Sequence, residues 1–337
     1  MTLYNGGKLR NNIKSSKLQE QVQQYSVEEE IDNIETSITE SFLQILYAQE
    51  SVKINEETVA LSKLQCERGK ALLEAGSISQ SDYAQLESQY SSDKYQLVLS
   101  QTTLESNIQT LKQLLEMDMT ETLSISTPIL EAHDVLTPLP GKEEVYQSAL
   151  NFIPSIQSGK LGIDIAKLEH KNAKAGYYPT LDLSASVGTG HISGSDSNFG
   201  QQMKNKLNES IGLTLSIPIF NNRENKSAVE KAKLQISEAE LEYLNAQKEL
   251  QKTIEDIYLD ATSSQAQYAA AIEQVKASKT SYNLAQEQFN LGMKNTVELL
   301  TEKNNFLSAQ QEMLQAKYMA ILNAQLLRFY QGKEITL

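Results

Sequence analysis

Two stretches of the chain, each longer than 60 residues, contain neither glycine nor proline: Lys8 to Arg68 and Arg223 to Leu291. Because these two residue types most often interrupt regular structure, each stretch predicts one long helix. A polar segment with a glycine follows each stretch, at Gly76 and Gly292, and predicts a tight turn into a second helix. At ~1.5 Å per residue, roughly 65 residues reach about 100 Å. A helix of that length buries its apolar stripe in long antiparallel hairpins or between several chains.

Core-type side chains recur along the later stretch at alternating steps of four and three residues. The positions are Leu250, Ile254, Ile257, Ala261, Ser264, Tyr268, Ala271, Val275, Ser278, Tyr282, Ala285 and Phe289. A sustained spacing of ~3.5 residues predicts left-handed supercoiling against a partner helix. Small residues recur along this seam and allow the helices to approach closely. In the first stretch the equivalent seam begins at Ile34. Cys66 occupies one of its positions and is interpreted as a small buried filler.

The chain also repeats itself at an offset of 216 residues, without a gap over more than a hundred residues. At this offset Asn5 falls on Asn221, and Gly76 falls on Gly292. The order of strand end, long helix, glycine turn and long helix therefore occurs twice. Length alone suggests two ordinary domains, but the repeat indicates two copies of one hairpin.

Between the two hairpins, two segments alternate aliphatic with small polar residues. The aliphatic positions are Leu181, Leu183, Ala185 and Val187, then Ile211, Leu213, Leu215, Ile217 and Ile219. This alternation predicts two β-strands of about ten residues. Two environments fit such strands: a half-buried hairpin packed on helices, or part of a transmembrane β-barrel. The second requires several chains, because an open sheet edge cannot face lipid.

Composition argues against several functional classes. A single cysteine excludes a disulfide framework and a zinc ribbon, and a net charge of −13 argues against binding nucleic acid. His133, His170 and His191 have no histidine partner three or four residues away, so no metal site is expected. The chain shows no phosphate-binding loop, nucleophile elbow or convincing catalytic triad order. We therefore predict neither an enzyme nor a cofactor.

The repeated order, together with its flanking motifs, resembles the TolC family of outer-membrane efflux proteins. The motifs are Asn-Gly-Gly-Lys-Leu-Arg before the first long helix, Gly-Tyr-Tyr-Pro-Thr-Leu at the first strand, and Ile-Pro-Ile-Phe-Asn-Asn before the second long helix. The tip segments 75–82 and 291–298 match as well, and the resemblance covers essentially the whole chain. It implies a homotrimer in which the protomers contribute strands to one outer-membrane β-barrel and helices to a periplasmic tunnel.

The resemblance also implies a function, partners and a location. The expected function is passive export of small molecules or proteins through a duct of a tripartite efflux or type I secretion system. An inner-membrane pump supplies the energy, and a periplasmic adaptor (membrane fusion) protein docks at the helical tips, where Gly76 and Gly292 lie. The implied location is the outer membrane, in contact with its lipid, with a periplasmic extension. No nucleic acid is expected among the partners.

In such proteins the tips of the two hairpins close the tunnel through polar contacts. Carried over by position, Ser81 and Asp82 of the first hairpin face Phe289 and Lys294 of the second. The family usually has Tyr and Arg at the last two positions, so fewer gate contacts are expected here. Glu298 matches an acidic ring position at the narrow entrance.

The expected fold is mainly α with a small β part: two long antiparallel coiled-coil hairpins plus strands of a trimeric barrel. Its predicted segments are 1–5 as the remnant of a first strand pair, 6–118 as the first hairpin, 119–176 as a connector with short helices, 177–220 as a strand pair with a loop over 190–208, 221–331 as the second hairpin, and 332–337 as a tail.

Compared with a complete family member, the chain is expected to be N-terminally truncated, because a signal peptide and most of the first strand pair do not precede Asn5. Three alternatives stay open at this point. The chain could be a soluble coiled-coil scaffold or interaction protein, or a non-functional fragment of the duct. A periplasmic adaptor fits less well, since adaptors carry one hairpin with β-rich domains.

Overall fold

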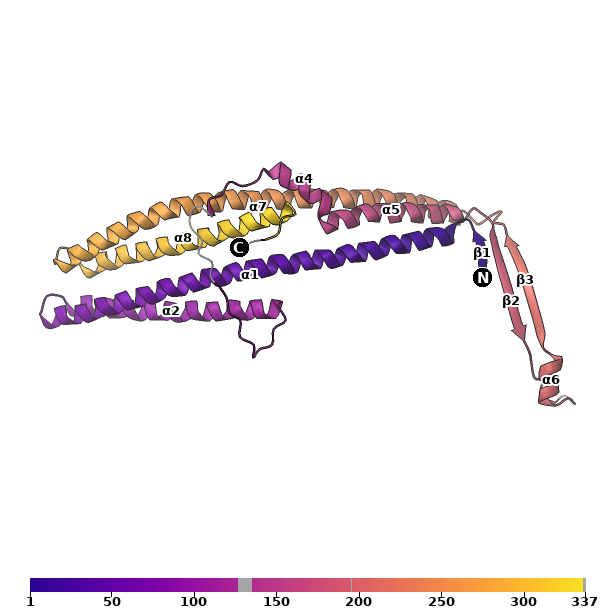
Figure 1. Cartoon of the computed structure of the whole chain (residues 1–337), viewed down its shortest axis with the longest axis horizontal. Helices are drawn as coiled ribbons and strands as arrows, with labels where there is room; N and C mark the ends of the chain where they lie inside the picture. Colours follow the sequence, from indigo (N-terminus) through magenta and orange to yellow (C-terminus); the bar gives the residue numbers. More distant parts are fainter. Residues whose placement is uncertain (127–134, 195, 336–337) are drawn as a thin grey trace. The chain divides into compact units, whose positions relative to one another are not determined.

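The computed structural model describes residues 1–126, 135–194 and 196–335 (Figure 1). Its elements, in chain order, are β1 (Thr2–Asn5), α1 (Lys8–Glu74), α2 (Gln80–Leu114), α4 (Lys142–Phe152), α5 (Pro154–Ala175), β2 (Thr180–Gly188), α6 (Phe199–Asn205), β3 (Asn208–Ser216), α7 (Glu224–Asn290) and α8 (Thr296–Tyr330). They form two compact units. One unit joins Met1–Glu29 to Ile153–Glu249, and the other joins Glu30–Phe152 to Leu250–Leu337. His133 lies outside the described residues.

The internal repeat is preserved at every end of the four long helices. Helices α1 and α7 each have 67 residues, and α2 and α8 each have 35. Helices α1 and α7 begin at Lys8 and Glu224 and end at Glu74 and Asn290, so both ends are 216 residues apart. The same offset relates the starts of α2 and α8, Gln80 and Thr296, and their ends, Leu114 and Tyr330. The predicted fold, mainly helical with two long antiparallel hairpins, is therefore confirmed.

The predicted seam of α7 is the buried face of that helix. Of its twelve positions, eight are buried and the other four are half-buried. On α1, Gly69 lies so close to α2 that a Cβ added to it would be 2.4 Å from Leu86 Cδ1, which explains a glycine in the seam. Cys66 is only half-buried rather than enclosed as predicted. Ile34 is exposed, because α2 ends at Leu114, before it reaches that level of α1.

The hydrophobic core of the second unit lies where the two hairpins meet. It is formed by Leu43 and Leu46 of α1, Tyr268 of α7, and side chains of α8 that include Leu314 and Tyr318. Helix α4 packs against α8. This core attaches the first hairpin to the second at one level of the second unit.

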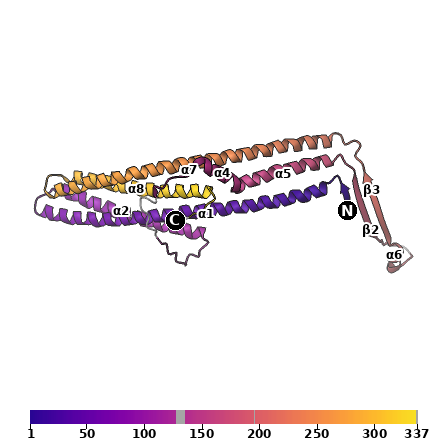
Figure 2. The same cartoon turned by 45° about the horizontal axis from the view of Figure 1, so that its top comes forward.

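In the first unit, α5 lies beside the N-terminal parts of α1 and α7, as Figures 1 and 2 show. Asn172 Nδ2 of α5 donates to Asn12 Oδ1 of α1 at 2.7 Å. On the other side, Gly159 lies against Tyr243 of α7, where a Cβ would be 3.1 Å from the ring. Both short helices, α4 and α5, lie within the segment 119–176 that was predicted as a connector with short helices.

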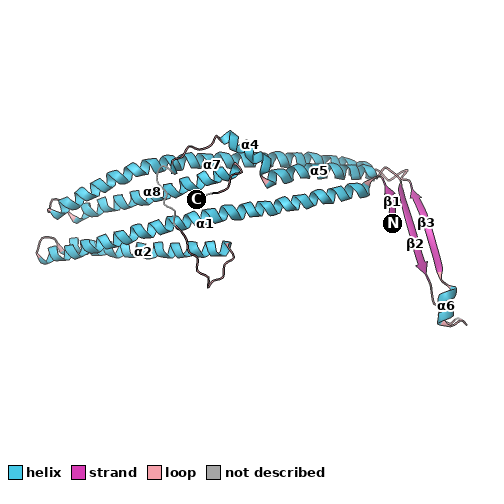
Figure 3. Cartoon of the chain, in the orientation of Figure 1, coloured by secondary structure: helices cyan, strands magenta, loops and turns pink. Residues whose placement is uncertain are grey.

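The first unit ends in a three-stranded antiparallel sheet of order β1-β2-β3 (Figure 3). In its register the aliphatic residues face one another in pairs, Leu181 with Leu215, Leu183 with Leu213 and Ala185 with Ile211. These pairs share one face, since neighbouring residues of a strand point to opposite faces. The face is open on β3, where Leu213 is 66% exposed. The sheet therefore presents an apolar surface that its own chain leaves largely uncovered.

Two details of this region differ from the prediction. Strand β3 ends at Ser216, not near Ile219, because the next pair in the register would join Ile217 to Pro179, which has no N–H to donate. The predicted loop over 190–208 contains the short helix α6, which begins after Asn198.

Among the described residues, no helix is both long enough and apolar enough to cross a lipid bilayer.

Candidate functional site

The two hairpin turns belong to the second unit and lie at the same end of it (Figures 1 and 2). Gly76 and Gly292 each adopt φ +73°, a left-handed conformation that strains residues with a Cβ. In each turn the amide of the residue after the glycine donates to the carbonyl five residues earlier, at 2.8 Å. This hydrogen bond closes the C-terminus of the long helix, so both turns use the same backbone motif.

Each turn leads into a helix that begins with a reciprocal cap. At α2, the Asp82 amide donates to Ser79 Oγ at 3.1 Å, and the Ser79 amide donates to Asp82 Oδ2 at 3.2 Å. At α8, the Glu298 amide donates to Asn295 Oδ1 at 2.9 Å, and the Asn295 amide donates to Glu298 Oε2 at 3.0 Å. Asp82 and Glu298 are therefore equivalent residues of the repeat, and both satisfy backbone groups at a helix start.

The capping role changes the titration of Asp82. Hydrogen bonds from the hydroxyl and the amide of Ser79 stabilise the charged carboxylate and lower the pKa of Asp82. The buried hydroxyl of Thr296, at the start of α8 in the second hairpin, contributes the smallest part of this lowering of the Asp82 pKa. The tip of the first hairpin therefore carries a carboxylate that stays ionised at neutral pH.

The residues predicted to form the gate lie on both sides of the two turns. Ser81 and Glu298 are exposed, whereas Asp82, Phe289 and Lys294 are half-buried. Among the described residues, Lys294 forms no ion pair with Asp82 within 4.0 Å. The Asp82 carboxylate instead accepts a hydrogen bond from the amide of Ser79, the cap residue of its own helix. The structure thus brings the five residues to one end of the unit, and no hydrogen bond or ion pair in the described part of the chain joins them across the two hairpins.

The two tips differ in their exposed side chains. The second tip carries three exposed apolar residues, Leu291, Met293 and Val297. At the equivalent positions of the first tip are Ala75, Ser77 and Ser81. A partner that binds by apolar contact would therefore prefer the second tip, although the two turns share one backbone geometry.

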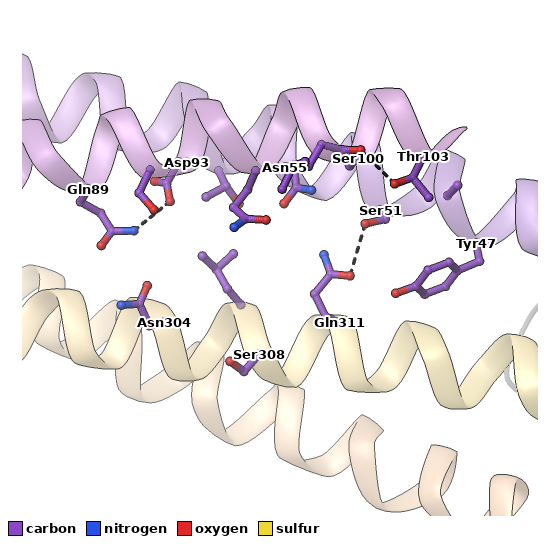
Figure 4. A pocket seen from close by; sticks show the side chains of 16 residues that line it. Tyr47, Ser51, Asn55, Gln89, Asp93, Ser100, Thr103, Asn304, Ser308 and Gln311 are labelled. Carbon is purple, nitrogen blue, oxygen red and sulfur yellow. Dashed lines mark hydrogen bonds between the residues drawn. The ribbon is translucent and has the colours of Figure 1, made fainter. Parts of the chain in front are cut away.

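Behind the tips, a polar pocket of about 630 Å³ lies between α1, α2 and α8 (Figure 4). Side chains from all three helices point into it, among them Ser51 and Asn55 of α1 and Asn304 of α8 (Figure 4). Ser51 Oγ donates to Gln311 Oε1 at 3.3 Å across the pocket. The contact between the hairpins is therefore polar here, unlike the apolar core around Leu43.

Asp93, which lines the pocket, belongs to a buried ion pair. Lys303 Nζ of α8 donates to Asp93 Oδ2 of α2 at 2.5 Å. Gln89 Nε2 donates to Asp93 Oδ1 at 2.8 Å (Figure 4). The side chains of Lys303 and Asp93 are only 1% and 7% exposed. Sequence reasoning missed this pair, because a lysine on a long polar helix is usually solvated and the repeat does not relate the two positions.

Further polar bridges join α1 to the second hairpin. Lys317 Nζ and Tyr318 Oη both donate to Glu50 Oε1 at 2.8 Å. Burial, followed by the hydrogen bond to Glu50, raises the pKa of Tyr318. Closer to the tips, Gln65 Nε2 donates to the Tyr282 hydroxyl at 2.8 Å. The hairpins are thus linked by directional contacts that a lateral shift of one hairpin would break.

The described histidines, His170 and His191, and Cys66 belong to no grouped set of metal ligands. His191 packs edge-on against Phe199, with ring centroids 5.3 Å apart. In residues 1–126, 135–194 and 196–335, no three His, Cys, Asp or Glu side chains are grouped so as to hold a metal ion.

Comparisons with known proteins agree with this architecture. Residues 1–116 and 145–333 match the family model described as outer membrane efflux protein. The chain is 23% identical over 335 residues to the outer membrane efflux protein BepC of Brucella suis, which covers 96% of this chain and 69% of that protein. It is 22% identical over 296 residues to the alkaline protease secretion protein AprF of Pseudomonas aeruginosa, covering 88% of this chain and 60% of that protein.

Among solved structures, the outer membrane protein VceC from Vibrio cholerae superposes with a TM-score of 0.79. The match covers 99% of this chain and 78% of VceC, at 15% sequence identity. The arrangement of hairpins and sheet is therefore one that is known from outer-membrane proteins.

Proposed function

The chain belongs to the outer membrane efflux protein family, and we propose that it forms part of an export duct at the outer membrane. Three copies would share one sheet in the membrane and one helical tunnel below it. Transport would be passive, with energy from an inner-membrane pump. The names of its relatives include both efflux and the secretion of a protease.

The apolar face of the β2–β3 pair is the observation that carries this proposal. On β3 the paired aliphatic residues Ile211, Leu213 and Leu215 are exposed in a single chain, while their β2 partners Leu181 and Leu183 are half-buried. Water-facing surfaces seldom keep such an apolar strip. The opposite face pairs Thr180 with Ser216 and Ser186 with Ser210, which suits a hydrated interior. A lipid-facing outer side and a water-facing inner side account for both faces.

A pair of lysine substitutions on neighbouring residues tests the orientation. Leu213→Lys places a charge on the apolar face and is expected to reduce the amount of chain recovered in the outer-membrane fraction severalfold, because a lysine facing lipid costs about 2–4 kcal/mol at mid-depth. Thr214→Lys is the matched control, since Thr214 lies on the opposite face and pairs with Asp182. Equal recovery of both variants, or of native chain as a soluble cytosolic dimer, would favour the coiled-coil scaffold instead.

For the periplasmic end, we propose that the tips form the entrance and the adaptor docking surface. The two acidic residues at equivalent positions, Asp82 and Glu298, together with Ser81, Phe289 and Lys294, would line the closed entrance. The adaptor would contact the exposed apolar residues of the second tip, Leu291, Met293 and Val297. In the assembled duct, Leu291→Ser with Met293→Ser is expected to weaken cross-linking to the adaptor, whereas Ser77→Ala on the first tip is expected to leave it unchanged.

A further inference from the structure

A groove of about 460 Å³ lies between the N-terminal part of α1 and the C-terminal half of α5, within the first unit. Lys14 and Lys17 line it from α1, and Lys167 and Lys171 line it from α5. Asp164 is the one carboxylate among its lining residues. The groove is therefore a site of concentrated positive charge in an acidic chain.

The charge of these helix segments is opposite to that of the rest of the chain. Segments 8–21 and 154–175 together carry eight lysine or arginine residues against three carboxylates, while the remaining sequence has 18 more acidic than basic residues. Lys167 Nζ lies 3.3 Å from Asp164 Oδ1. Within the described residues, the other three groove lysines have no carboxylate oxygen within 4.0 Å. Their charges are available to a ligand.

The groove lies next to the sheet. Helix α1 begins three residues after β1, and α5 ends five residues before β2 (Figure 1). At ~1.5 Å per residue, the four lysines lie about 6 to 14 Å from the sheet-side ends of their helices. A bilayer has a polar headgroup layer roughly 5–8 Å thick beyond each side of its hydrocarbon core. Flexible lysine side chains span the remaining distance.

Aromatic residues mark the junction between sheet and helices as a membrane interface. Tyr177 and Tyr178, between α5 and β2, are 53% and 55% exposed, and Tyr4 of β1 and Phe220 after β3 are exposed as well. Tyrosine is enriched at the boundary between lipid and water, where its ring and hydroxyl meet different surroundings. In the first unit an apolar sheet face is followed by exposed aromatic residues and then by a lysine groove. This is the order of the hydrocarbon core, the lipid–water boundary and the headgroup layer of a bilayer.

We propose that the four-lysine groove binds the phosphate of an anionic phospholipid headgroup in the periplasmic leaflet of the outer membrane. This inference rests on the proposed function, because it requires the sheet to lie in the membrane. Lysines from two helices line a space large enough for a phosphate diester, and the apolar sheet face would adjoin its acyl chains. Binding would set the depth of the sheet in the bilayer and hold α1 and α5 together.

Vesicle flotation tests the proposal with the purified full chain. Vesicles of phosphatidylcholine alone report binding through the apolar sheet face, and vesicles with one third phosphatidylglycerol add the anionic headgroup. Each lysine near an anionic surface contributes about fivefold to partitioning. At about 0.05 M salt, Lys14→Gln, Lys17→Gln and Lys171→Gln together are expected to lower the additional binding to phosphatidylglycerol at least tenfold. At about 0.5 M salt, screening is expected to remove the difference between this variant and the native chain.

The matched control removes three exposed lysines of the second unit, Lys53→Gln, Lys70→Gln and Lys279→Gln, and is expected to bind like the native chain. A variant with arginine at the three groove positions keeps the charge and is expected to restore binding. Equal loss in the groove and control variants, or no loss in the groove variant, would overturn the proposal. Salt-sensitive binding to phosphatidylglycerol without binding to neutral vesicles would instead contradict the proposed function and leave the lysine groove intact.

Discussion

Lys303 of α8 and Asp93 of α2 form an ion pair in which both side chains are buried from solvent. The second carboxylate oxygen of Asp93 accepts from Gln89, so the charge is satisfied on both sides. Because a buried charge is costly without its partner, this contact fixes which part of the first hairpin meets which part of the second. It is stronger as a determinant of register than as a source of stability.

We expect Lys303→Met to lower the free energy of unfolding by about 3–5 kcal/mol, because it leaves the Asp93 carboxylate buried and unpaired. The double variant Lys303→Met with Asp93→Leu is expected to recover most of the loss. Urea denaturation followed by circular dichroism measures both. Lys63→Met is the control, since Lys63 and Glu67 are 60% and 62% exposed and such pairs contribute about 0–1 kcal/mol. A single variant as stable as this control would contradict the assignment.

The cap and the gate at Asp82 can be separated by conductance measurements on the assembled duct. Asp82→Ala removes both the proposed gate carboxylate and the cap, and is expected to raise single-channel conductance. Ser79→Ala removes the capping hydroxyl and leaves the carboxylate. We therefore expect the free energy of unfolding to fall by about 1 kcal/mol and the conductance to stay at its native value. If Ser79→Ala raised conductance equally, fraying of α2 would explain the effect and the gate assignment would fail.

Arg223→Gly is expected to stabilise the chain by about 1 kcal/mol. Arg223 adopts φ +66°, where a residue with a Cβ is strained, and the equivalent residue of the first repeat is Gly7 at φ +84°. Thermal unfolding measures the change. Gly76→Ala introduces the same strain at φ +73° and is expected to destabilise by a similar amount. A melting temperature that does not rise with Arg223→Gly would show that the turn relaxes around the arginine.

Stability is expected to fall as pH rises above 10. The pKa of Tyr318 is raised in the folded chain, mainly by burial, whereas in the unfolded chain the phenol ionises near its ordinary value of 10.0. Below pH 10 the phenol is protonated in both states, so its ionisation does not change the free energy of unfolding. Above pH 10 the phenol ionises in the unfolded chain alone, which lowers the free energy of unfolding. Tyr318→Phe is expected to flatten the decline of unfolding midpoints between pH 9 and pH 11, and Tyr95→Phe, at an exposed position, serves as control. Parallel declines would contradict this assignment.

The elements that sequence predicted well depend on local patterns. The long helices follow from the placement of glycine and proline, and the seam follows from a spacing that a helix reproduces wherever it lies. Strand β1 has only four residues, too few for alternation to be visible, and segment 1–5 was predicted as a strand remnant only from the family resemblance. Helix α6 lies in a loop rich in glycine and serine, although Asn198, whose side chain accepts from the Gln201 amide at 2.9 Å, was a usable capping signal.

The contacts between the hairpins could not be predicted in the same way. Asp93 and Lys303 are 210 residues apart, and the 216-residue repeat does not align one position with the other. Their pairing depends on the lateral position of two hairpins, which no local pattern encodes. The capping roles of Asp82 and Glu298 were available from sequence, because Ser79 and Asn295 stand three residues before them.

The buried ion pair also decides which hairpins can be neighbours. The residue of the first hairpin equivalent to Lys303 is Glu87. If a first hairpin took the place of a second one, Glu87 would meet Asp93, and two carboxylates would be buried without a cation. Two backbones of nearly the same form are thus made non-interchangeable by one side chain, and in any closed ring of these chains like hairpins cannot stand next to each other through this surface.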